Sequence, residues 1–359
     1  MFSIHSMEKQ ALPLRIWFLF LSLVCSSAAA DPTLQLASIG NLNLSSGDTL
    51  LDAKVGYRTA GTLNEDKSNV IIFLTWFTGT TEDLFSSGQI GSGKMADTDR
   101  YFVIAIDALG NGVSSSPSNS PMQPDKQFPR ISMADMVNSQ HVLLTRHLGI
   151  DHAVAVIGIS MGGMQTYHWM GQFPGFMDKA IPIIGTPKAT SYDLLQWQTQ
   201  EQAIIGMQDA GVENSEITEF LNWLGLMTLW TPGYFVENVS VENLPQFVED
   251  FGQGHEKRDA NDYLTQLRAM IDVDVYMNDT VSKVSYQDRV RAEVLVINSA
   301  SDHTVNPNPG KTLSESIGAK YVEIDSICGH MGTACESDRV NQAVRAFLGS
   351  SPTGQNRPH

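Results

Sequence analysis

The sequence predicts an α/β fold in which a mostly parallel, doubly wound β-sheet carries an inserted helical segment. Short runs rich in Val, Ile and Leu recur along the 359 residues with helix-like stretches between them, as in parallel strands that are buried on both faces. These runs are absent from one long stretch, 189–288. The composition, with 42% hydrophobic and 17% charged residues, supplies enough apolar material for a packed core.

These patterns predict the positions of the strands and helices. Strands are expected at 70–73, 101–106, 153–157, 180–184, 293–297 and 321–324. Helices are expected at 132–148, 161–172, 310–316 and 336–348. Their alternation along the chain is typical of a sheet covered by helices on both faces.

The first thirty residues have the pattern of a secretory signal peptide. Lys9 and Arg15 precede an apolar run at 16–24, and three consecutive alanines end at Ala30. A membrane anchor is the alternative, but the run has about half of the roughly 20 residues needed to span a bilayer. We therefore expect cleavage after Ala30, export to a periplasm or to the medium, and no membrane contact of the mature form.

Acidic residues dominate the rest of the chain. The formal net charge is −16, and loss of Glu8, Lys9 and Arg15 with the leader, a net loss of +1, changes it to −17. A strongly acidic protein repels phosphate backbones and anionic membrane surfaces. We therefore expect no nucleic acid partner.

The stretch 189–288 is rich in Gln, Met and Trp and lies between strand-like segments. We interpret it as a helical lid inserted into a core formed by 31–188 and 289–349, with 350–359 as a flexible tail. A separate helical domain without a catalytic role is the alternative. The lid is favoured because the stretch follows the strand of the candidate nucleophile and precedes the strand of the candidate acid.

Residues 158–162, Gly-Ile-Ser-Met-Gly, match the motif G-x-S-x-G at Ser160. An expected strand precedes the motif and an expected helix follows it, which is the context that the motif requires. Such a strand-to-helix turn lifts the serine hydroxyl above the sheet, and side chains in place of the glycines would clash there. These features predict an α/β-hydrolase fold with Ser160 as the nucleophile.

Asp302 and His330 are expected to complete a catalytic triad with Ser160. Serine is a weak nucleophile, so a histidine must accept its proton and an acid must hold the tautomer of that histidine. In this fold the order along the chain is Ser, acid, His, and each residue follows a core strand. Asp302 follows the fifth expected strand and His330 follows the sixth. Asp325 is the alternative acid, although it lies very close to the end of the last strand.

Two backbone N–H groups are expected to bind the oxyanion that develops during acyl transfer. Met161 should supply one because it begins the helix after the nucleophile, and Phe77, in the loop after 70–73, should supply the other. The segment 88–94 approaches the pattern of a phosphate-binding loop, but Met95 stands where a Ser or Thr should hold magnesium. No other cofactor or metal pattern is found in the sequence, and we expect neither.

Cys328 and Cys335 are the only cysteines after the leader, and they bracket His330. In an oxidising compartment they could form a disulfide. Disulfide geometry is demanding, so two free thiols are the alternative.

Three segments make the chain resemble the homoserine O-acetyltransferase family from about residue 45 to about residue 348. They are Ser-Met-Gly-Gly-Met-Gln at 160–165, Ile-Gly-Ser-Gly-Lys at 90–94 leading to Asp-Thr-Asp-Arg-Tyr-Phe at 97–102, and Asp-Ala-Asn-Asp-Tyr-Leu at 259–264. The resemblance implies an α/β-hydrolase core, an acyl-serine intermediate and a helical lid. It also implies that the lid could form a homodimer, as it often does in this family.

Two positions depart from that family. Its members usually follow the catalytic histidine with an aspartate that holds the homoserine amine, and here Met331 follows His330. The lid arginine that should bind the homoserine carboxylate aligns with Glu201. Because a buried unpaired charge is costly, these departures argue against homoserine as the acceptor.

The function that these observations favour is an exported serine hydrolase, esterase-like, acting on a small acyl ester. Acetyl-CoA is a cytoplasmic metabolite, whereas water is the abundant acyl acceptor outside the cell. The alternative is an acyltransferase of the homoserine O-acetyltransferase type, in which an alcohol takes the acyl group faster than water does. A catalytically silent binding protein is disfavoured by the intact order of Ser160, Asp302 and His330.

Overall fold

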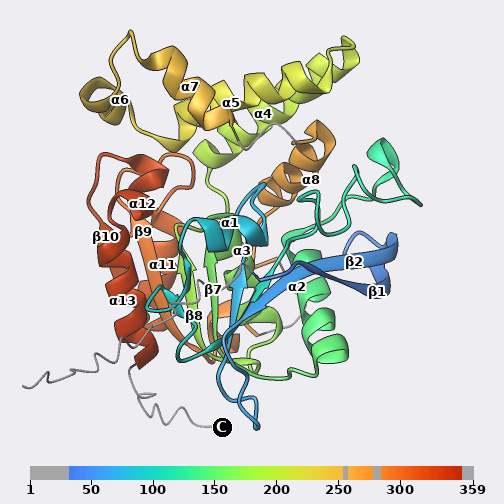
Figure 1. Cartoon of the computed structure of the whole chain (residues 1–359), viewed down its shortest axis with the longest axis vertical. Coiled ribbons are helices and arrows are strands. Elements are labelled where there is room, and N and C mark those ends of the chain that lie inside the picture. Colours follow the sequence, from blue (N-terminus) through green and yellow to red (C-terminus); the bar gives the residue numbers. More distant parts are fainter. Residues whose placement is uncertain (1–31, 254–257, 278–283, 350–359) are drawn as a thin grey trace, which may run out of the picture. The chain divides into compact units, whose positions relative to one another are not determined.

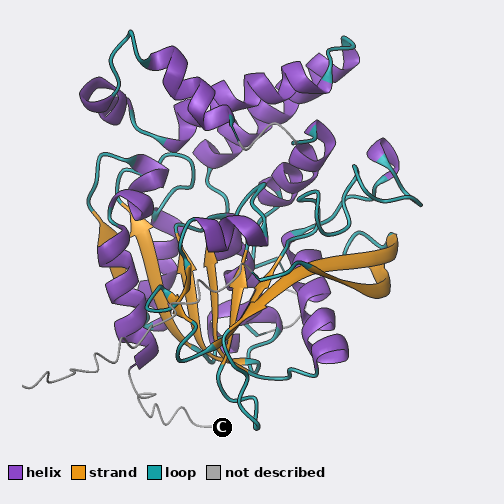
Figure 2. Cartoon of the chain, viewed as in Figure 1, coloured by secondary structure: helices purple, strands orange, loops and turns teal. Residues whose placement is uncertain are grey.

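The computed structural model describes residues 32–253, 258–277 and 284–349. An eight-stranded sheet lies at its centre, with helices against both faces (Figures 1 and 2). The predicted leader and the predicted tail at 350–359 lie outside the described residues. Within the described ranges, no helix is long and apolar enough to cross a membrane.

The strand order of the sheet is β1-β2-β6-β3-β7-β8-β9-β10. In this spatial order, every neighbouring pair from β6 through β3, β7, β8 and β9 to β10 is parallel, which confirms the mostly parallel sheet. These strands are β3 (Val70–Leu74), β6 (Phe102–Ile106), β7 (Ala153–Ile159), β8 (Met177–Ile183), β9 (Glu293–Ser299) and β10 (Lys320–Ile324). They correspond to the six expected runs, with ends that differ by a few residues.

Two further strands extend one edge of the sheet and were not predicted. They are β1 (Gln35–Asn43) and β2 (Thr49–Ala60), which pair antiparallel with each other, and β2 also pairs antiparallel with β6. Because many of their side chains are exposed or only partly buried, these strands lack the continuous apolar run that marks a fully buried strand.

Helices cover both faces of the sheet because alternate side chains of each strand point to opposite sides. On β3, Ile72 joins the cluster that contains Trp169, and Ile71 joins the one that contains Val344. The first face carries α2 (Met133–Val142), its π-helical continuation η2 (Leu143–Leu148), and α3 (Met161–Gln172). The remaining helices and turns of the core are α1 (Thr81–Ser86), η1 (Asp125–Gln127), α11 (Asn308–Ile317), η3 (Gly329–Met331), α12 (Gly332–Cys335) and α13 (Ser337–Gly349). The short strands β4 (Ile90–Gly91) and β5 (Ala96–Asp97) form a separate pair.

Between β8 and β9 the described chain is helical, as the sequence predicts (Figure 1). The helices are α4 (Ser191–Asp209), α5 (Asn214–Leu229), α6 (Pro232–Asn238), α7 (Leu244–Gly252), α8 (Ala260–Ile271) and α10 (Tyr286–Arg289). A buried apolar cluster joins this insertion to the core and includes Trp197, Leu221 and Leu264 together with Met161 and Met164. The chain rejoins the core before 288, because Lys188 bridges to Asp274 and the Tyr286 hydroxyl donates to the Tyr167 carbonyl over 2.6 Å.

Candidate active site

Ser160 lies in the turn between β7 and α3. Its backbone has φ 57° and ψ −119°, a region that non-glycine residues rarely adopt. A Cβ added at Gly158 would lie 2.0 Å from the Gly162 carbonyl oxygen, and one added at Gly162 would lie 2.5 Å from the Leu74 carbonyl oxygen. The two glycines therefore permit the close approach of strand, turn and helix that holds Ser160 in this conformation.

The structure brings Ser160, His330 and Asp302 together in one chain of hydrogen bonds. Nε2 of His330 lies 2.9 Å from Oγ of Ser160, and Nδ1 lies 2.6 Å from Oδ2 of Asp302. The other carboxylate oxygen of Asp302 accepts the N–H groups of Thr304 and Val305, both at 2.9 Å. An ionised carboxylate accepts from Nδ1–H, which leaves Nε2 to accept from the serine hydroxyl. All three side chains are buried.

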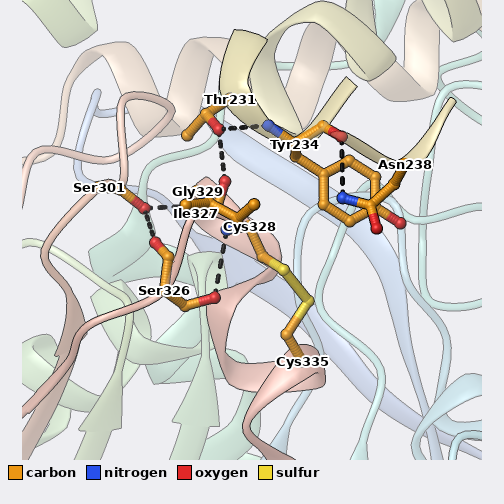
Figure 3. The surroundings of a disulfide bond; sticks show 9 residues. All are labelled: Thr231, Tyr234, Asn238, Ser301, Ser326, Ile327, Cys328, Gly329 and Cys335. Carbon is orange, nitrogen blue, oxygen red and sulfur yellow. Dashed lines mark hydrogen bonds between the residues drawn. A yellow bond between two sulfur atoms is a disulfide. The ribbon is translucent and has the colours of Figure 1, made fainter. Parts of the chain in front are cut away.

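The alternative acid, Asp325, is exposed, and it is Asp302 that contacts the histidine. Ser301 ties the loop of Asp302 to the loop of His330. Its hydroxyl donates to the carbonyl of Ser326 and accepts the N–H of Gly329 at 3.1 Å (Figure 3). Two loops that follow different strands are therefore held as one unit.

The first helix of the insertion contacts the acid loop directly. Asp193, in the first turn of α4, accepts the N–H of Asn306 at 2.9 Å and also caps its own helix. Burial raises the pKa of the Asp193 carboxyl, and the nearby charge of Asp302 raises it further. One turn later, the Gln196 amide donates to the carbonyl of His303. The loop that carries Asp302 is therefore fixed from the insertion as well as from the sheet.

The loop of His330 is closed by a disulfide between Cys328 and Cys335, so the two cysteines are paired (Figure 3). The histidine lies inside the ring that this bond closes. From the insertion, the hydroxyl of Thr231 donates to the carbonyl of Ile327. Covalent and hydrogen bonds thus hold this loop on both sides of the histidine.

The two amides expected to bind an oxyanion lie on the nucleophile turn and on the loop after β3. The N–H of Met161 is the first of α3 and has no acceptor within that helix. Phe77 lines the same cavity as Ser160. Next to Phe77, the N–H of Thr78 donates to Oε1 of Gln266 over 2.7 Å, and the Gln266 amide donates to the carbonyl of Leu109 over 3.1 Å. Gln266 belongs to α8, so the insertion also holds this loop.

Ser160 and His330 open onto a cavity of about 350 Å³ between the sheet and the insertion. Its walls are mainly apolar and include Trp76, Trp197 and Phe251. No Asp or Glu occurs among the described lining residues. Across the described ranges, no group of three or more His, Cys, Asp or Glu side chains is placed to hold a metal ion.

A family model described as the alpha/beta hydrolase fold matches residues 70–333. The chain belongs to this family. The α/β hydrolase resembles a probable esterase of Corynebacterium glutamicum, with 41% identity over 172 residues that span 47% of this chain and about half, 49%, of that protein.

Longer matches reach two kinds of enzyme. An ethyl acetate hydrolase of Pseudomonas veronii is 28% identical, covering 83% of this chain and 89% of its own. A homoserine O-acetyltransferase of Methanococcoides burtonii is 29% identical, covering 86% and 72%. Among solved structures, an acetylester hydrolase from Corynebacterium glutamicum superposes with a TM-score of 0.81 and 29% identity over 89% of this chain and 96% of its own. The expected resemblance to homoserine O-acetyltransferases is confirmed.

The two positions at which this chain departs from the homoserine O-acetyltransferase pattern have defined surroundings. Glu201 accepts from Nε of Arg268 at 2.7 Å, in a pair that lies within the insertion. Met331 lines the cavity beside His330. Glu201 is therefore not left unpaired, and neither residue offers a cation or an anion to a ligand in the cavity.

Sequence reasoning missed the residues of the insertion that hold the site loops, Asp193, Gln196 and Gln266. A Thr-x-x-Asp pattern at 190–193 marks the start of α4 and could have located that helix. No sequence pattern connects Asp193 with Asn306, because the two residues are 113 positions apart.

Proposed function

We propose that this α/β hydrolase is an exported serine esterase that hydrolyses small acyl esters through an acyl-serine intermediate. The hydrogen-bonded chain from Ser160 through His330 to Asp302, next to an apolar cavity, carries the proposal. Similarity to proteins named as a probable esterase, an ethyl acetate hydrolase and an acetylester hydrolase supports it.

Acylation follows from the geometry. Oγ of Ser160 attacks the carbonyl carbon of the ester while Nε2 of His330 takes the hydroxyl proton. Asp302 holds the ring and stabilises the imidazolium. The N–H groups of Met161 and Phe77 stabilise the oxyanion of the tetrahedral intermediate. The intermediate then breaks its bond to the alcohol oxygen, which receives the proton from His330.

Deacylation repeats these steps with water. His330 takes a proton from a water molecule as the water oxygen attacks the acyl carbon. When the bond to Ser160 breaks, the proton returns to the serine oxygen and the carboxylic acid leaves. The apolar walls suit the carbon chain of an ester and strengthen the electrostatic interactions at the reacting carbon.

Export is supported by the leader-like segment 1–30 and by the disulfide between Cys328 and Cys335, since disulfides persist in oxidising compartments.

Acyl transfer to an alcohol is the second candidate, favoured by the homoserine O-acetyltransferase relatives. It would share the acylation steps and differ in the acceptor of the acyl group. Met331 and the pairing of Glu201 with Arg268 disfavour homoserine as that acceptor.

Mass spectrometry of the protein separates these candidates. The protein is exposed to a fluorophosphonate and, separately, to acetyl-CoA followed by homoserine. We expect Ser160 to take the phosphonate and to show no acetyl group that homoserine discharges. An acetylated Ser160 that homoserine does discharge would establish the transferase, and the absence of both labels would contradict serine acyl-transfer chemistry.

A further inference from the structure

One charged side chain interrupts the otherwise uncharged wall of the cavity. Arg258 lies among its lining residues, just before the start of α8. The other described residues of that wall include no further Arg and no Lys, Asp or Glu. The cavity therefore presents a positive charge to whatever occupies it.

No group in the described part of the chain pairs with this guanidinium through an ion pair or a hydrogen bond. The two groups whose charges act on the pKa of Arg258 are Tyr263 and Asp83. The Asp83 carboxylate accepts the N–H and the hydroxyl of Thr80 at 2.7 and 2.9 Å, and the Tyr263 hydroxyl donates to Gln200 over 2.8 Å. Both neighbours are thus engaged elsewhere.

The fold itself gives little reason for a cation at this position. Asp259 caps the N-terminus of α8, so Arg258 stands next to the positive end of a helix, where a cation is disfavoured. Burial lowers the pKa of Arg258 to about 10, which leaves it protonated at neutral pH. A partly buried charge without a partner is costly, and an anionic ligand would supply that partner.

We propose that Arg258 binds an anionic group of the substrate, and that the preferred substrates of this hydrolase are esters that carry a carboxylate. A guanidinium offers a planar fork of N–H donors that matches a carboxylate in two parallel hydrogen bonds. The apolar walls hold the carbon chain between that carboxylate and the ester. The inference rests on the proposed esterase function and specifies the substrate class.

Matched pairs of esters test this substrate preference. For a carboxylate on the acyl side, mono-4-nitrophenyl succinate is compared with 4-nitrophenyl butyrate. For a carboxylate on the alcohol side, 4-acetoxybenzoate is compared with phenyl acetate. We expect about a tenfold higher kcat/KM for the charged member of one pair, mainly through KM, and the pair that responds identifies the side.

Substitutions of Arg258 assign that preference to the guanidinium. Arg258→Met should lower kcat/KM for the charged ester about tenfold more than for its neutral partner. Arg258→Lys keeps the positive charge but lacks the planar pair of N–H donors. Its ratio of kcat/KM for the charged ester to that for the neutral ester should lie between the ratios of the wild type and Arg258→Met. Arg130→Met is the matched control, because it removes a surface arginine that pairs with Asp272, and it should leave the ratio unchanged. No preference in either pair, or a preference that survives Arg258→Met, would overturn the proposal.

Binding to the Ser160→Ala protein decides the question without turnover. Calorimetry should show tighter binding of monomethyl succinate than of methyl butyrate, or of 4-acetoxybenzoate than of phenyl acetate. Equal binding within both pairs would contradict an anion site at Arg258. If the Ser160→Ala protein prefers the anionic ligand but the wild type hydrolyses none of the esters, the esterase proposal alone is contradicted.

Discussion

The sheet and the helical insertion position the parts of the candidate site in different ways. Ser160 is held by residues close to it in sequence, because glycines at 158 and 162 allow the strand, turn and helix to meet. The loops of Asp302 and His330 are also hydrogen-bonded to the insertion: Asp193 accepts the N–H of Asn306, and the hydroxyl of Thr231 donates to the carbonyl of Ile327. The position of the nucleophile is thus set by neighbouring residues, whereas the positions of Asp302 and His330 also depend on contacts between segments that are far apart in the sequence.

Replacing Ser160 by Ala should have the largest effect on activity. If Ser160 is the nucleophile, hydrolysis of a nitrophenyl ester should fall by roughly 10⁴-fold or more. The unfolding free energy should change little, because the substitution removes one oxygen. Near-normal turnover by a correctly folded variant would refute the assignment of the nucleophile.

Asp193→Ala probes the contribution of the insertion. We expect about a tenfold loss of kcat, because the loop of Asp302 loses its bond at Asn306. Loss of the helix cap should also lower the unfolding free energy by about 1 kcal/mol. Asp135→Ala is the matched control, since Asp135 caps α2 in the same way. An equal loss of kcat in both variants would mean that the insertion does not position the acid loop.

Asp262 joins the insertion to the core and should make stability depend on pH. Its carboxyl accepts the N–H and the hydroxyl of Ser118 at 2.9 and 2.5 Å, and burial is the main cause that raises its pKa from 3.8 to about 6. Because the folded carboxyl holds its proton more tightly, this contribution to stability is complete only below the unfolded pKa of 3.8. It declines as the pH rises and is lost above pH 6.

Comparison with Asp262→Asn isolates that contribution. Between pH 3 and pH 7, the unfolding free energy of the wild type should fall by about 3 kcal/mol relative to the variant, which does not titrate at this position. Denaturant unfolding across this range measures the difference. Parallel stability curves for the two proteins would show that Asp262 does not couple folding to pH.

Removal of the disulfide should change the unfolding free energy less than the titration of Asp262 does. The double substitution Cys328→Ser and Cys335→Ser opens a short loop, and we expect a loss of about 2 kcal/mol in unfolding free energy. A few-fold loss of kcat should accompany it, because His330 lies within that loop. Wild type treated with a reductant should behave like the variant. Unchanged stability and turnover in both samples would show that hydrogen bonds alone hold the histidine.

The edge strands show where sequence patterns stop being informative. Strands buried on both faces, such as β3 and β7, were predicted because each is a continuous apolar run. In β1 many side chains are exposed and in β2 most are only partly buried or exposed, so no such run exists. These strands form because β2 pairs with β6, and that pairing depends on residues far apart in the chain.

By itself, the sequence determined the α/β fold, the helical nature of the insertion and the candidates Ser160, Asp302 and His330. Each depends on local chemistry: apolar periodicity, a glycine-flanked turn and residues that directly follow strands. The tertiary structure decided the pairing of Cys328 with Cys335 and the attachment of the insertion to the site loops. It also placed Arg258 in the cavity, because packing fixes which distant groups meet, and no local pattern records that.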